Sequence, residues 1–222
     1  MLGFIETQAP ATIRRAVLDL QSEILSEPYF AGVPRVTHTT GVAFHAKDDE
    51  PAVRYRFFKL LADLEFEAQI IVARKIERVF RTNFEAKEQA FYDHLVTRLF
   101  QNLLHRYSQN QIIFAKRGSR NRQAPLLAAI YNGIRAFEKQ WNTQVTTQVS
   151  VAAQTPKGEP CLSVVDYVNW AVHRAYTTGE MRYFRLVQDK VALLVDLYDT
   201  QRYPESWYSR KNPFDIAEAT PL

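Results

Sequence analysis

The sequence predicts an α/β protein in which a mixed sheet is flanked by helices. Apolar runs typical of strands alternate along the chain with longer segments whose apolar residues recur at helical spacing. No Gly-, Pro- or Ser-rich linker divides the chain. With 222 residues, 46% of them hydrophobic and 23% charged, the chain is long enough for one large core. We therefore expect a single domain over residues 1–199, followed by a tail over 200–222 that packs on the surface.

Apolar runs and polar–apolar alternation identify the expected strands. The first is the short run after Met1, and the second alternates before it becomes fully apolar. We expect strands at 2–5, 65–74, 111–115 and 144–152.

Helical spacing and proline positions identify the expected helices. The first begins at Pro10 and ends before Pro28, because proline suits the first turn of a helix and cannot continue one. The region 28–48 contains helix-breaking residues and is expected to be a loop. We expect helices at 10–27, from 51 onward, and at 84–107, 125–141, 160–176 and 181–194.

Composition excludes several classes of protein. The single cysteine, Cys161, rules out an internal disulfide and a cysteine-based zinc site. No window approaches 18 consecutive apolar residues and the N-terminus lacks a signal-peptide pattern, so we expect a cytoplasmic protein that does not bind membranes. There is no glycine-rich phosphate loop. The net charge of +4 permits nucleic-acid binding without requiring it.

Asp166 is the most informative single residue. It lies in segment 160–176, which is apolar on most helical turns, and Asn169 and His173 follow it on the same helix face. A buried carboxylate is normally paired, hydrogen-bonded or bound to a metal. Two interpretations stay open: Asp166 has a cap, backbone-amide or arginine partner, or it binds a divalent cation together with other carboxylates.

Two stretches carry a resemblance to a known family. The segment CLSVVDYVNWAVHRAYTTGEMRYFRLV, which contains Asp166, and the segment FHAKDDEPAVRYRFFKLLADLEFEAQIIVARK, which contains His45 and ends at Lys75, resemble the family called domain of unknown function 3800. The resemblance spans roughly residues 2–195. It implies a ribonuclease H-like fold, in which acidic residues on a mixed sheet hold Mg²⁺ or Mn²⁺ for phosphodiester hydrolysis. In that fold Asp166 would be the catalytic and metal-binding carboxylate on the last core helix.

The chain also departs from the family pattern. Family members begin with a strand carrying Asp-Glu-Ser, whereas residues 2–7 here resemble the second strand of the family. We expect that this first strand is missing through a truncated start; the alternatives are that the protein has lost the strand or that the family pattern differs here. The absence of the strand would leave two neighbouring strands with open edges, through which the chain can form homo-oligomers.

Other candidate residues have two interpretations each. His45 is either a catalytic or metal-binding residue or part of a solvated loop, and Asp49 is expected to cap the helix after Pro51. Five basic residues either contact nucleic-acid phosphates or are simply solvated: Lys75, Lys116, Arg117, Arg120 and Arg122.

Two functions follow. The first is metal-dependent hydrolysis of nucleic acid by a ribonuclease H-like protein. The alternative is a non-catalytic module that retains the fold and binds nucleic acid or protein. An enzyme of this kind needs at least two further carboxylates near Asp166, whereas a binding module does not.

Overall fold

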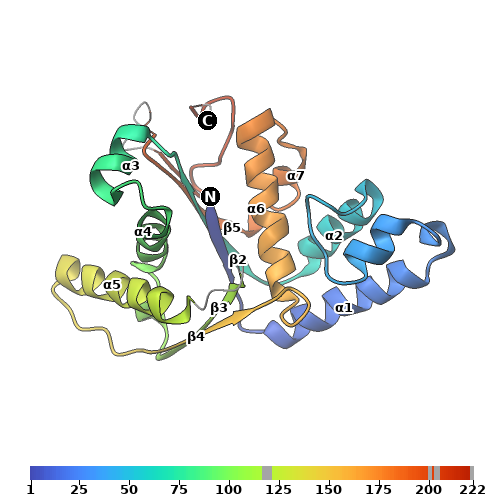
Figure 1. Ribbon diagram of the computed structural model, residues 1–222, viewed down its shortest axis with the longest axis horizontal. Coiled ribbons are helices and arrows are strands. Elements are labelled where there is room, and N and C mark those ends of the chain that lie inside the picture. Colours follow the sequence, from blue (N-terminus) through green and yellow to red (C-terminus); the bar gives the residue numbers. More distant parts are fainter. Residues whose placement is uncertain (117–121, 200–201, 203–205, 221–222) are drawn as a thin grey trace.

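The computed structural model describes residues 1–116, 122–199, 202 and 206–220. Its larger sheet has four strands, in the order β1 (Leu2–Glu6), β2 (Glu67–Ala73), β5 (Val191–Leu197) and β6 (Trp207–Tyr208). Strands β2 and β5 are parallel, and the other two pairs are antiparallel. The expected mixed sheet flanked by helices is therefore confirmed (Figure 1).

A second, smaller sheet consists of the parallel strands β3 (Gln109–Ala115) and β4 (Gln148–Gln154). Helix α5 (Gln123–Trp141) lies between them in the sequence, as parallel strands require a crossover connection. α5 packs against β4 and against the preceding helix α4 (Glu88–Phe100). Among the described strands, no hydrogen-bonded pair joins this sheet to the larger one.

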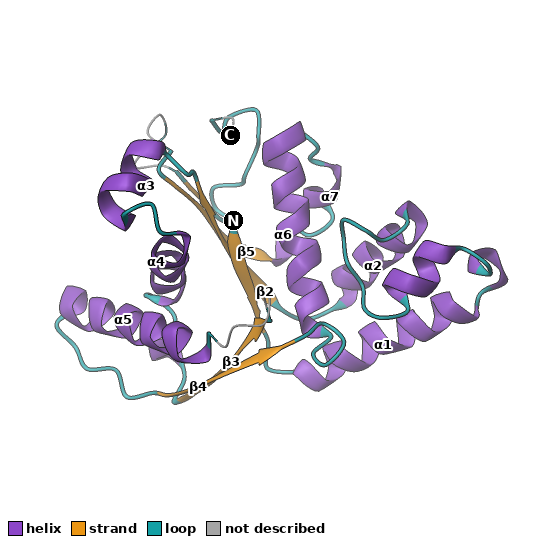
Figure 2. Cartoon of the chain, viewed as in Figure 1, coloured by secondary structure: helices purple, strands orange, loops and turns teal. Residues whose placement is uncertain are grey.

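Helices cover both faces of the larger sheet (Figure 2). On one side lie α1 (Pro10–Ser26), α2 (Pro51–Asp63), α6 (Cys161–Thr178) and the short α7 (Arg182–Arg185). On the other side lie α3 (Glu77–Phe84), α4 and α5. None of the helices in the described part of the chain has the length and apolar character needed to cross a membrane.

The sheet separates two hydrophobic clusters. Ile70 and Val72 of β2 belong to the cluster beneath α1, α2 and α6, whereas Ile71 belongs to the cluster beneath α4 and α5. Successive side chains of a strand point to opposite faces, so β2 contributes to both cores and is almost entirely buried.

The helix predicted over 84–107 is wrong at both ends, and only Glu88–Phe100 forms a helix, α4. Glu85 and Ala86 have left-handed backbone conformations, with φ of 51° and 56°, that separate α4 from α3, and beyond Phe100 the chain turns before a 3-10 turn at Leu104–Arg106. The apolar spacing of α4 was predicted, but nothing in the composition of this segment signals the two left-handed residues.

The helix predicted over 181–194 is also wrong. After the single turn α7, the chain forms a 3-10 turn at Gln188–Lys190 and then strand β5. β5 is a parallel neighbour of β2 and is largely apolar, so it lacks the strict alternation that identifies half-exposed strands. The expected loop over 28–48 contains a 3-10 turn at Pro28–Phe30 and a π-helical turn at Val36–Thr40.

The described part of the tail joins the main body. Strand β6 pairs with β5, and the Phe214 ring stacks on Tyr176 of α6 with centroids 5.1 Å apart. Tyr208, Phe214 and Ala219 are buried in the cluster beneath α6.

Candidate functional site

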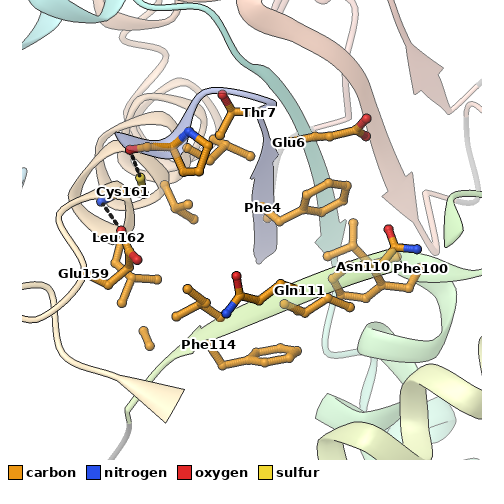
Figure 3. A pocket seen from close by; sticks show the side chains of 18 of the residues that line it. Phe4, Glu6, Thr7, Phe100, Asn110, Gln111, Phe114, Glu159, Cys161 and Leu162 are labelled. Carbon is orange, nitrogen blue, oxygen red and sulfur yellow. Dashed lines mark hydrogen bonds between the residues drawn. The ribbon is translucent and has the colours of Figure 1, made fainter. Parts of the chain in front are cut away.

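A groove of about 450 Å³ lies between β1 and β3. Every residue of both strands lines it, together with the end of α4 and the beginning of α6. Among the described strands, β1 pairs only with β2 and β3 pairs only with β4. Each strand therefore directs one open edge into the groove, and Figure 3 shows their side chains converging from two sides.

Aromatic rings form the wall of the groove on the α4 side. Phe4 of β1 stacks on Phe100 of α4 with ring centroids 5.1 Å apart, and Phe100 lies 6.3 Å from the ring of Phe114 on β3 (Figure 3). Leu99 and Leu103 of the same helical region are buried beside them. This wall is suited to apolar side chains.

The opposite wall, formed by α6, is polar. Asn169 Oδ1 is buried there and has no hydrogen-bond donor within the described structure. It lies so close to β1 that a Cβ atom at position 3 would overlap it, which explains the glycine at Gly3. A buried acceptor without a donor is costly, and this one is packed against the backbone of β1.

An ion pair fixes the beginning of α6. Arg14 of α1 donates through Nε and Nη2 to both carboxylate oxygens of Glu159, and Glu159 Oε1 also accepts from the Cys161 amide. Burial opposes ionisation of Glu159, but the hydrogen bonds from Arg14 and Cys161 outweigh it and lower its pKa. Burial and the neighbouring Glu159 raise the pKa of the Cys161 thiol to about 12, so this cysteine is not an activated nucleophile.

The structure brings Asp166 and His45 together. Asp166 Oδ2 accepts a hydrogen bond of 2.8 Å from the backbone N–H of Ala46 and lies 4.0 Å from His45 Nδ1. His45 Nδ1 lies 3.3 Å from Asp48 Oδ2. The three side chains form a half-exposed cluster, with 38%, 48% and 54% of Asp166, His45 and Asp48 accessible. Asp166 therefore has a backbone-amide partner, as the first of its two interpretations expected.

Asp49 has a structural role that the sequence did not indicate. It does not cap α2, whose N-cap is Glu50 and has no side-chain cap. Instead it is fully buried and accepts hydrogen bonds from Thr40 Oγ1, the His45 amide and Tyr167 Oη. Burial raises its pKa, although these donors partly oppose the shift.

The described side chains do not fit a divalent metal centre on their own. Among residues 1–116, 122–199 and 206–220, no three His, Cys, Asp or Glu side chains are arranged to hold a metal ion. Both oxygens of Asp49 accept hydrogen bonds from the protein, and one oxygen of Asp166 does so. Mg²⁺ and Mn²⁺ require several oxygen ligands, which this arrangement does not offer.

Two of the five basic candidates have carboxylate partners. Lys75 pairs with Glu88 at 2.7 Å, and Arg122 pairs with Asp93. Lys116 is exposed at the end of β3. The other two candidates, Arg117 and Arg120, lie outside the described residues.

Sequence reasoning missed a buried ion cluster at the carboxyl ends of β2 and β5. Arg74 Nη2 lies 2.8 Å from Asp196 Oδ2 and 3.6 Å from Asp199 Oδ2, and both carboxylates are buried. Burial raises the pKa of Asp196, while Arg74 opposes the shift. The one available signal was the single charge of Asp196 within the apolar run VALLVDL.

Sequence reasoning expected two strands with open edges beside a missing strand, but it did not identify the groove between β1 and β3 or the side chains that line it.

Comparison with protein-family models, with curated proteins and with solved structures gave no significant match. The resemblance to the family called domain of unknown function 3800 therefore stays a prediction.

Proposed function

We propose that this chain is a non-catalytic binding module that holds an extended polypeptide segment in the groove between β1 and β3. The observation that carries the proposal is that two open strand edges face one cavity. Open edges present unpaired N–H and C=O groups, which are the groups that bind extended peptides. The cavity volume of about 450 Å³ lies within the usual range of ligand sites.

The charges around the groove favour a polypeptide over a nucleic acid. Among the described residues, its lining contains the carboxylates Glu6, Glu159 and Asp166 and a single cation, Arg14. These carboxylates would repel the phosphates of a nucleic acid that approached the groove. The pairing of Lys75 and Arg122 with carboxylates further reduces the positive charge available for a nucleic acid.

Selection from a displayed library of random dodecapeptides tests the proposal. Enriched peptides should bind the wild-type protein and lose at least tenfold in affinity to Val165→Arg, which places a long side chain in the groove. The control is Leu18→Arg on the exposed face of α1, which should bind like the wild type. Circular dichroism should confirm that both variants fold. Failure to enrich any peptide sensitive to Val165→Arg would exclude the groove as a polypeptide site.

The second candidate function is metal-dependent hydrolysis of nucleic acid by a ribonuclease H-like protein. It is favoured by the position of Asp166 in the lining of the same groove, with 38% of its side chain accessible. The family resemblance assigns the catalytic carboxylate to this residue. With the described residues alone, the ligands for Mg²⁺ or Mn²⁺ are incomplete.

A cleavage assay separates the two candidates. The wild type and Asp166→Asn should be compared on single- and double-stranded DNA, RNA and hybrids with Mg²⁺ or Mn²⁺. Cleavage that disappears in Asp166→Asn would establish the nuclease. A folded wild type that cleaves none of these substrates would leave the binding module as the remaining function.

A further inference from the structure

We infer that this protein has a second binding site, in which Arg54 of α2 and Arg174 of α6 bind a single phosphate monoester group. The two guanidinium groups lie against the same indole ring, that of Trp170. None of these three residues lines the groove between β1 and β3, so the inference does not depend on what the groove holds.

Three helices bring the site together, since α2 and α7 both lie beside α6 (Figure 1). The Cζ atom of Arg54 is 4.6 Å from the centroid of the Trp170 ring, and the Cζ atom of Arg174 is 5.8 Å from it. Tyr183 of α7 packs edge-on against the same ring, with centroids 4.7 Å apart. These four residues, here called the Trp170 cluster, are all partly exposed.

No carboxylate of the protein neutralises the two arginines of the Trp170 cluster. Within the described ranges of the chain, neither Arg54 nor Arg174 forms an ion pair. Arg14 and Arg74, by contrast, each pair with a carboxylate. The indole ring attracts both cations, but it carries no net charge. An anion bound to both guanidinium groups would relieve the repulsion between them.

Arg54 is held in place by the loop before α2. Its Nε donates to the carbonyl of Ala46 at 2.6 Å, and its Nη2 donates to the carbonyl of Asp49 at 2.7 Å. Its Nη1 makes no hydrogen bond to the residues that the structure describes, and this atom is not fully buried. Because these bonds fix the guanidinium before a ligand arrives, little side-chain entropy is lost on binding.

Arg174 has still more donors to offer. Its guanidinium makes no hydrogen bond to any part of the chain that the structure describes. The Nε is buried, whereas Nη1 and Nη2 are not fully buried and can reach a ligand from solvent. Guanidinium groups form strong, charge-assisted hydrogen bonds to phosphate oxygens, so the accessible nitrogens of the two arginines are suited to this group.

The surrounding carboxylates limit the ligand to one anionic group. Asp166 lies one turn before Trp170 on α6, with Asp48 near it. At the other end, the Glu180 amide donates to the carbonyl of Arg174. A nucleic acid would bring its neighbouring phosphates toward these carboxylates. A phosphate monoester instead concentrates its negative charge on one group with three acceptor oxygens.

Titrations followed by ³¹P NMR test the inference, with inorganic phosphate and phenyl phosphate as probes at about physiological ionic strength. Both probes should bind the wild type and bind Arg174→Gln at least tenfold more weakly. The control is Arg135→Gln on the exposed surface of α5, which removes the same charge on the other side of the larger sheet and should bind within about twofold of the wild type.

A second variant at the same position guards against a folding defect. Arg174→Lys keeps the positive charge but lacks the planar fork of donors, so it should bind phenyl phosphate at least threefold more weakly than the wild type. Circular dichroism shows whether each variant folds, and Arg174→Lys decides the matter if Arg174→Gln does not.

A heptapeptide with a central phosphoserine identifies the source of the phosphate group. If it displaces phenyl phosphate at least tenfold better than inorganic phosphate does, and its unphosphorylated form displaces none, the group belongs to a modified polypeptide. If it competes no better than inorganic phosphate, the ligand is a small phosphate ester. Both outcomes support the site.

Three results would overturn the inference. The first is a folded wild type that binds neither probe nor the phosphopeptide. The second is an equal loss of affinity in Arg174→Gln and Arg135→Gln, which would show that only the overall charge matters. The third is a single-stranded oligonucleotide that binds at least tenfold more tightly than phenyl phosphate and depends on Arg174, which would identify a site for a polyanion.

Discussion

The Tyr167 hydroxyl donates a hydrogen bond of 2.6 Å to Asp49 Oδ2 and so ties the middle of α6 to the loop before α2. Both side chains are fully buried. The same loop is held to α6 by the Ala46 amide, which donates to Asp166 Oδ2. The position of the cluster around His45 therefore depends on a buried carboxylate that does not belong to the cluster.

Tyr167→Phe should lower the free energy of unfolding by about 2 kcal/mol, because it removes a hydrogen bond to a buried carboxyl group and leaves one acceptor without its donor. Urea unfolding followed by circular dichroism measures the change. The control is Tyr55→Phe on the exposed face of α2, which should leave the midpoint unchanged. Equal stability of Tyr167→Phe and the wild type would show that this hydrogen bond does not stabilise the fold.

The raised pKa of Asp49 predicts a specific pH dependence. Between its ordinary value of 3.8 and the raised value, the folded state keeps a proton that the unfolded state has lost. The contribution of this group to stability is therefore complete below pH 3.8 and declines as pH rises through the folded pKa. The free energy of unfolding of the wild type should fall relative to that of Asp49→Asn across this window. Urea titrations at a series of pH values would contradict the assignment if the difference between the two proteins stayed constant.

Two adjacent basic residues should differ sharply in their effect on stability. Arg74→Met removes the guanidinium that pairs with the buried Asp196 and lies 3.6 Å from Asp199, and it should destabilise the protein by about 3–5 kcal/mol. Lys75→Met removes an exposed pair with Glu88 and should not change the urea midpoint. The contrast would fail if both variants unfolded at the same urea concentration.

Gly3→Ala should destabilise the protein by about 1–3 kcal/mol, because the added methyl group overlaps Asn169 Oδ1. In an Asn169→Ala background the same substitution should be much less harmful, since the overlapping atom is absent. Thermal or urea unfolding of the four proteins in this double-mutant cycle measures the interaction. Additive effects would mean that Gly3 is required for another reason.

The parts of the fold that were predictable are those with local signals. Pro10 and Pro28 delimit α1 to within a residue or two, and the glycine C-cap at Gly179 follows the apolar periodicity of α6. Strand β5 escaped prediction because its run VALLVDL is apolar at successive positions, so it lacks polar–apolar alternation. The interruption between α3 and α4 escaped because the left-handed conformations of Glu85 and Ala86 have no local sequence signal.

The candidate site was predictable only in part, for the same reason. Asp166 stood out as a carboxylate on an apolar helix, and a backbone amide was one of its expected partners. The buried acceptor on Asn169 and the groove between β1 and β3 depend on contacts between segments more than 100 residues apart, such as Tyr107 with Glu6. No local pattern encodes such contacts.

The strand order of the larger sheet has a consequence for biosynthesis. β2 pairs with β1 as soon as residues 2–73 have emerged, but its other neighbour, β5, begins at Val191. At ordinary rates of translation, the ribosome needs roughly ten seconds to add the intervening residues. During that interval β2, which is almost entirely buried in the finished protein, has one edge without a partner strand on the nascent chain. A chaperone that shields this edge would act at this stage.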